Sequence, residues 1–393
     1  MLKKIEVNKL RLGMYVQEIC ASWVDHPFWK TKFFLDEPRD LKTLLQSGVK
    51  EVWIDIARGL DVEAAPQEEK LPSAPKAPKE AVRQVPLKEE MARAKLIRTK
   101  AKQAVTSMFQ EVRMGNALHS NDAAGLVDEI TLSVTRNPSA LLSLVRLKNK
   151  DDYTYLHSVA VCALMVSLGR QLGMEGDALK SVGMAGLFHD VGKMMIPEEV
   201  LNKPGKLTDE EFGVIKTHPE RGWEILKTAS DVDDVALDVC RHHHERVDGR
   251  GYPDGLSGDA LTLFARMGAV CDVYDAITSN RCYKTGWDPV EAIRKMAEWQ
   301  EGHFDQAVFQ AFVKTVGIYP VGTLVKLKSL RLGVVTDQTA RSLLKPVVKV
   351  FFSIRSNGPI LPELVDLSRL QDEITSVEDP AKWNVNPMVL AGI

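Results

Sequence analysis

The chain has 393 residues, of which 45% are hydrophobic and 26% charged, which is enough for about two or three domains with buried cores. Its 51 Lys and Arg residues nearly balance 53 Asp and Glu residues, and the net charge of −2 excludes a bulk basic surface for a DNA or RNA polymer. Five scattered cysteines without a Cys-x-x-Cys pair argue against a disulfide framework or a thiolate zinc site. With no apolar stretch of membrane-spanning length and no visible signal peptide, these features predict a cytoplasmic protein that is not embedded in a membrane.

The first 62 residues alternate short apolar runs with turn residues. The runs at residues 14–16 and 52–54 predict strands, and residues 40–46 between them predict a helix. Residues 1–62 are therefore expected to form a small α+β domain, which we interpret as regulatory. Residues 63–86 are rich in Pro, Ala, Lys and Glu, a composition that cannot bury enough apolar surface to fold, so they predict a semi-extended linker.

From residue 87 the apolar pattern becomes helical. Between Leu87 and Val112 apolar residues recur every three or four positions, which predicts a helix that either pairs across a homodimer or packs on its own domain. Further helices are expected near residues 122–147, 153–172, 178–191, 208–227, 233–244, 260–279, 288–300 and 305–316. We assign residues 87–150 to a helical linker and the start of a bundle, and residues 140–319 to the bundle itself.

After Pro320 the period changes to two. Apolar alternation near residues 323–327, 333–336 and 347–352 predicts strands, so residues 320–393 are expected to form a small β-rich extension.

Histidine and aspartate residues fall at positions that can converge inside the bundle. They are His157, His189, Asp190, His218, His243, His244 and Asp272. Imidazole and carboxylate ligands together suit divalent iron, manganese, nickel or zinc, and helix bundles hold two-metal centres with ligands from several helices. Taken singly, each histidine is far more often an ordinary core or surface residue than a ligand, so the joint pattern carries the prediction of a metal centre.

Three segments of the sequence resemble the signature of a known family. They are LFHDVGK at residues 187–193, HHERVDGRGYP at residues 243–253 and DVYDA at residues 272–276. In this order they resemble the HD-GYP family, bacterial HD-superfamily phosphodiesterases that degrade cyclic dinucleotides, chiefly cyclic di-GMP. The resemblance covers about residues 140–315. Residues 1–62, with LRLGMYV at residues 10–16, more loosely resemble an uncharacterised domain often fused ahead of HD-GYP modules.

The resemblance implies a mainly α fold with a binuclear metal centre. An all-helical HD-GYP bundle would carry the centre, flanked by the small N-terminal α+β domain and the short C-terminal β unit. By position, the ligands of the first metal would be His157, His189, Asp190 and Asp272, and those of the second His218, His243 and His244, with Asp190 bridging the two.

Tyr153 stands where family members with three metals have a glutamate. Because a phenol is normally protonated near neutral pH, we expect two metals here. Iron or manganese is the expected pair, with nickel or zinc as alternatives.

Four further residues match family positions that contact the substrate. Lys193 matches a lysine on the scissile phosphate, where a cation would offset developing negative charge, and we assign it a catalytic role beside Asp190. Asp275, Arg281 and Lys284 match positions that face the substrate, and Arg281 can grip a phosphate with two hydrogen bonds or stack on a guanine. The alternative for all four is an ordinary charged helix end or loop.

Gly251, Tyr252 and Pro253 form the loop that gives the family its name. Two glycines and a proline within residues 249–253 predict irregular backbone. In the family this loop lies near the metal site and has a reputed role in docking diguanylate cyclases, the GGDEF proteins.

These observations predict a metal-dependent phosphodiesterase that hydrolyses cyclic di-GMP to linear pGpG, with further hydrolysis to GMP left open. Two alternatives remain. The preferred substrate could be cyclic GMP-AMP or another cyclic dinucleotide, because no residue visibly reads the second base. The protein could instead be a weakly catalytic receptor or adaptor that recruits diguanylate cyclases through residues 251–253, although such an adaptor has no need of seven intact ligands.

Overall fold

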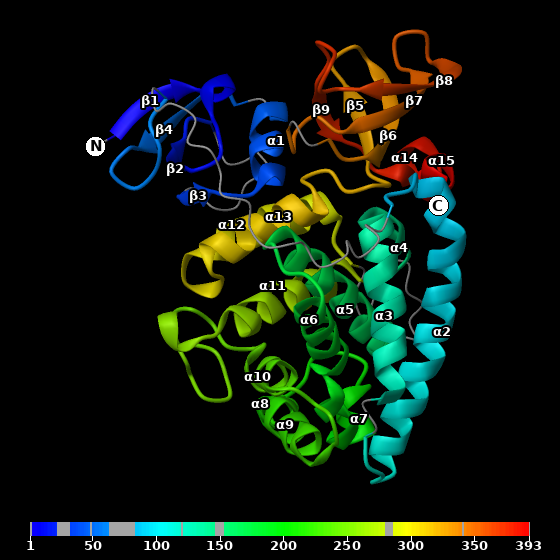
Figure 1. Ribbon diagram of the computed structural model, residues 1–393. Coiled ribbons are helices and arrows are strands. Elements are labelled where there is room, and N and C mark those ends of the chain that lie inside the picture. Colours follow the sequence, from blue (N-terminus) through cyan, green and yellow to red (C-terminus); the bar gives the residue numbers. More distant parts are fainter. Residues whose placement is uncertain are drawn as a thin grey trace. The chain divides into compact units, whose positions relative to one another are not determined.

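The computed structural model describes residues 2–21, 32–47, 49–62, 83–118, 121–145, 153–279, 286–339 and 342–392 (Figure 1). The described residues form two compact units, one built mainly from residues 84–316 and one from residues up to 83 together with residues 317–391. None of the helices within these ranges has the length and apolar character needed to cross a membrane.

Residues near the N-terminus form a four-stranded antiparallel sheet. Its strands run in the order β1 (Leu2–Glu6), β4 (Glu51–Asp55), β2 (Met14–Ile19) and β3 (Phe33–Leu35), and α1 (Pro38–Gln46) precedes β4. Val52 and Ile54 of β4 are fully buried while the residues between and beside them are not, which is the alternation of a strand with one face on a core. The predicted strands β2 and β4 and the predicted helix are confirmed. β1 is rich in charge and β3 has three residues, so neither was predicted.

The C-terminal residues form a second antiparallel sheet of five strands. These are, in spatial order, β8 (Gly358–Asp366), β7 (Val347–Ser353), β6 (Arg331–Asp337), β5 (Leu324–Leu327) and β9 (Ile374–Val377), followed in the chain by the short helices α14 (Pro380–Trp383) and α15 (Pro387–Ala391). The predicted β-rich extension is confirmed. The sequence did not predict β8, because Pro359 and Pro362 break its pattern; a strand with prolines fits at the edge of a sheet, where it lies.

The unit of residues 84–316 is built from helices. They are α2 (Leu87–Arg113), α3 (Asn121–Arg136), α4 (Pro138–Val145), α5 (Tyr153–Gln171), α6 (Asp177–Phe188), α7 (Glu198–Leu201), α8 (Asp209–Ile215), α9 (His218–Thr228), α10 (Asp234–His242), α11 (Leu263–Thr278), α12 (Pro289–His303) and α13 (Gln306–Val316). The single helices expected over residues 122–147 and 208–227 are each two helices. Pro138 begins α4, and Pro219 follows the first residue of α9, because proline has no N–H to continue a preceding helix.

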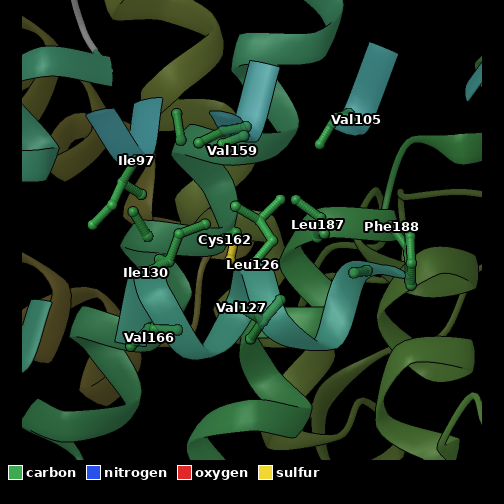
Figure 2. Close-up of a cluster of buried hydrophobic side chains, with 14 of the residues drawn as sticks. Ile97, Val105, Leu126, Val127, Ile130, Val159, Cys162, Val166, Leu187 and Phe188 are labelled. Atoms are coloured by element: carbon green, nitrogen blue, oxygen red, sulfur yellow. The ribbon is translucent and has the colours of Figure 1, made fainter. Parts of the chain in front are cut away.

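Helix α5 lies at the centre of this unit and packs against α2, α6, α11 and α13. Its residues from Leu156 to Gly169 are all buried, which explains why its sequence is apolar on every face. Figure 2 shows side chains of α3 and α5, among them Ile130, Cys162 and Val166, meeting in the core. The core therefore holds the N-terminal half of α5, where His157 lies, in a fixed position.

Helix α2 contributes its apolar stripe to the same core. Met91, Ala94, Ala101 and Val105 are all buried there. Of the two alternatives for this helix, packing on its own domain accounts for the stripe.

Candidate metal centre

The structure brings the seven predicted ligands together from five helices and their ends. His157 is the fifth residue of α5, Asp272 lies within α11, and the other five stand at the ends of α6, α9 and α10. They form two groups, in each of which the ligand atoms lie within 4.8 Å of one another. The first group is His157, His189, Asp190 and Asp272, and the second is His218, His243 and His244.

Asp190 lies between the two groups, and its side chain is buried. Its Oδ2 atom is 3.3 Å from Nε2 of both His157 and His189. Its Oδ1 atom is 3.2 Å from Nε2 of His218 and 3.7 Å from Nε2 of His243. Each carboxylate oxygen therefore faces a different group, which is the arrangement that a bridging ligand needs.

Main-chain carbonyls set the ring orientation of three of the histidines. Nδ1–H donates to a carbonyl oxygen in His189 (to Gly186, 2.8 Å), His218 (to Ile215, 2.7 Å) and His243 (to Val239, 3.0 Å). Because a carbonyl can only accept, the proton of the neutral ring is on Nδ1 and Nε2 keeps its lone pair.

Nε2 atoms of different histidines also lie close together. Nε2 of His157 is 3.2 Å from Nε2 of His189, and Nε2 of His218 is 3.4 Å from Nε2 of His243. Imidazole nitrogens gathered in this way can serve together as ligands of one metal ion.

Charge and burial also fit a cation at this place. Oδ1 of Asp190 is buried and has no hydrogen-bond partner in the part of the chain that the structure describes. Although burial favours the neutral acid, the charge of the nearby Lys193 ammonium holds the pKa of Asp190 well below its ordinary value, so it is ionised. Burial lowers the pKa of His244 to about 3, so this ring is neutral. Ionised carboxylates with neutral imidazoles are a donor set for divalent transition metals, and the residues present fit such ions.

Asp275 lies behind the first group. We expected it to face the substrate, but its carboxylate is 2% exposed and Oδ2 is 2.6 Å from Nδ1 of His157. Asp272 and Asp275 are three residues apart on α11 and so share one face, which brings both to the same ring. A carboxylate on the second nitrogen of a ligand imidazole fixes the ring and raises its basicity.

Lys193 lies on the short 3₁₀ helix η4 (Val191–Met195) that follows Asp190. Its Nζ atom is 2.5 Å from Oδ2 of Asp190, and its side chain is 20% exposed. It therefore reaches from the buried carboxylate toward solvent, as a residue that contacts both the centre and a substrate must. The other predicted substrate contacts, Arg281 and Lys284, lie outside the described residues.

The loop at residues 248–255 lies against the second group. The ring of Tyr252 stacks on the ring of His244, with centres 4.8 Å apart and planes inclined by 29°, and the bond from Tyr252 to Pro253 is cis. A Cβ on Gly251 would lie 2.4 Å from Cα of Glu245, so only glycine allows this close approach.

Glu245 holds the same loop in place. Its carboxylate is 2% exposed and accepts hydrogen bonds from the backbone N–H groups of Asp254 (2.7 Å) and Gly255 (2.9 Å). Our reading of the sequence missed this residue, although it directly follows two predicted ligands. His242 is held between Asp238 and Asp254 and belongs to neither ligand group.

We expect Gly192→Ala to destabilise the helical unit. A Cβ there would lie 2.0 Å from the carbonyl oxygen of His218 and 2.4 Å from the backbone nitrogen of Gly222, so α9 would have to move away. Overpacking of this kind costs about 1–3 kcal/mol, measurable by urea denaturation. In the control Gly213→Ala, the new Cβ meets no atom within 4 Å. That variant should gain about 0.5–1 kcal/mol from helix propensity. If Gly192→Ala is as stable as Gly213→Ala, the close packing around residue 192 is contradicted.

Comparison with known proteins agrees with this centre. A model of the HD domain matches residues 135–308, and a model of a domain of unknown function, DUF3391, matches residues 2–123. Cyclic di-GMP phosphodiesterase PA4108 of Pseudomonas aeruginosa is 56% identical over 394 residues, which cover 98% of this chain and 94% of that protein.

Two relatives match a smaller part of the chain. Cyclic di-GMP phosphodiesterase response regulator RpfG of Xanthomonas campestris pv. campestris is 37% identical over 177 residues, 45% of this chain and 46% of that protein. The 3'3'-cGAMP-specific phosphodiesterase 1 of Vibrio cholerae serotype O1 is 36% identical over 166 residues, 42% of this chain and 38% of that protein. With its ligand groups, its signature segments and a relative similar over nearly its whole length, the chain belongs to the HD-GYP family of HD-domain phosphodiesterases.

Proposed function

We propose that this protein is a metal-dependent phosphodiesterase that hydrolyses cyclic di-GMP to linear pGpG. The observation that carries the proposal is Asp190, whose two oxygens face two complete groups of ligands. The relative that is similar over nearly the whole chain is a cyclic di-GMP phosphodiesterase, which favours this substrate over other cyclic dinucleotides.

We assign the centre two divalent ions, iron or manganese. When bound, such a pair lowers the pKa of water and offsets charge on a phosphoryl group. The protein's own residues orient the metal ligands and neutralise charge on the substrate. Asp275 fixes the orientation of the His157 ring, and Asp190 presents one carboxylate oxygen to each of the two ligand groups. Lys193 is placed to exchange its contact with Asp190 for one with a substrate phosphate, where its charge stabilises the transition state. Arg281 and Lys284 are proposed to hold the rest of the substrate.

We further propose a regulatory role for residues 1–62.

We also propose a cytoplasmic location. The described free thiols, Cys20, Cys162, Cys240 and Cys271, suit a reducing compartment. Recruitment of diguanylate cyclases through Tyr252 is a second candidate role for the loop, and it is compatible with catalysis because this ring is partly exposed.

The test is a chromatographic time course with full-length protein, purified without oxygen and loaded with iron or manganese. Cyclic di-GMP, 3'3'-cGAMP and cyclic di-AMP are supplied at equal concentration, with Asp190→Ala as the inactive control. We expect pGpG to form, and kcat/KM to be highest for cyclic di-GMP. Faster cleavage of 3'3'-cGAMP would replace the proposed substrate, and tight binding without cleavage by fully metallated protein would support the receptor instead.

A further inference from the structure

A strip of side chains leads outward from the second ligand group. Tyr252 stacks on His244, and Nζ of Lys216 lies 5.4 Å from the centre of the Tyr252 ring. The same Nζ atom lies 4.8 Å from the centre of the Phe212 ring. Lys216 follows the last residue of α8 and precedes the ligand His218 by two positions, so the backbone that places the ligand also places this lysine.

Lys216 is a cation without a carboxylate partner in the described part of the chain, where no carboxylate oxygen lies within 4.0 Å of its Nζ atom. By contrast, Lys193 pairs with Asp190, and Lys203, which flanks the same helix α8, pairs with Glu211 at 2.6 Å. Phe212 is 45% exposed, a large fraction for a phenylalanine. The strip thus offers an ammonium without a carboxylate partner and, beneath it, a largely exposed aromatic ring, connected through Tyr252 to a ligand of the metal centre.

This pair of groups suits a guanine base. A lysine ammonium only donates, and guanine presents two acceptors, O6 and N7, on one edge, whereas adenine presents an amino donor beside N7. Any base can stack on an aromatic ring, so the ring contributes affinity and the lysine contributes the choice of base. A phosphate group would pair with the Lys216 ammonium, but it would not account for the exposed ring of Phe212 beside it.

We infer that Lys216 and Phe212 form a subsite for one guanine base of the cyclic dinucleotide, in which Lys216 donates to the O6 and N7 edge. This inference rests on the proposed function and adds to it the residue that selects guanine over adenine. Lys216 has a flexible stem and is exposed, so it can turn from the rings to the edge of a base that lies on Phe212.

The test measures kcat/KM for cyclic di-GMP, 3'3'-cGAMP and cyclic di-AMP with metal-loaded full-length protein. The glutamine amide pairs with the N6 and N7 edge of adenine, so Lys216→Gln should lower the preference for cyclic di-GMP over cyclic di-AMP by about tenfold. Phe212→Ala should raise KM for all three substrates and leave their ratio unchanged, because stacking does not distinguish the bases.

Lys227→Gln is the matched control. Nζ of Lys227 also lies over an aromatic ring, 4.7 Å from the centre of that of Trp223. Within the described residues this ring does not stack on a ligand histidine, so the ratio should stay as in the wild type. Metal content is measured for every variant. An unchanged ratio in Lys216→Gln, or an equal loss for all three substrates, overturns the guanine subsite while leaving the proposed function in place. A wild-type enzyme that cleaves no cyclic di-GMP overturns both.

Discussion

Replacing Asp190 with Asn is expected to lower the turnover of cyclic di-GMP by at least about 10³-fold, because catalysis by paired metals supplies several kcal/mol and each 1.36 kcal/mol is a factor of ten. In the wild type each oxygen of Asp190 faces one ligand group. Asparagine has one carbonyl oxygen and one amide group, and the amide N–H atoms would point at the cation of the group they face. We therefore expect one metal ion per chain to be lost while the fold is kept.

Metal per chain is measured by plasma mass spectrometry, and pGpG formation by chromatography. The matched control is Asp238→Asn, since Asp238 pairs with His242, outside both ligand groups. This control should keep its metal and its activity. Asp190→Asn with two ions per chain and wild-type turnover would rule out the bridging role.

Asp275→Ala is expected to weaken metal binding by about 10–100-fold, the usual effect of removing a carboxylate behind a ligand histidine. The loss should show in metal titrations of the free protein, because Asp275 acts through the ring of His157 and is 2% exposed. At saturating metal, KM for cyclic di-GMP should change little.

Asp275→Asn distinguishes a role in positioning His157 from a role in contacting the substrate. Its side-chain carbonyl can still accept from Nδ1–H of His157, so it should recover part of the metal affinity that Asp275→Ala loses. The substrate-facing role that the sequence resemblance implies makes the opposite prediction. In that case KM would rise in both variants and the affinity for metal would be that of the wild type.

The apolar pattern of the sequence predicted helices correctly where that pattern was strong. The buried helix α5 and the apolar stripe of α2 follow directly from residue type and spacing. The breaks before α4 and α9 were missed, although Pro138 and Pro219 mark them, because the apolar pattern continues across both prolines. Strand β8 was missed because its prolines are tolerated only through its place at a sheet edge, which is a property of the sheet.

By itself, the sequence determined the chemistry of this protein. The kinds of ligand and their order along the chain are properties of residue identity and spacing, and they predict a metal centre. The resemblance of the signature segments to the HD-GYP family implies a metal-dependent phosphodiesterase. The tertiary structure decided how those ligands are used, because distances between α5, α6, α9, α10 and α11 depend on how the helices pack. That packing turns the two oxygens of Asp190 to different groups, presses Asp275 against His157 and brings Lys216 over Tyr252, whose ring rests on a ligand.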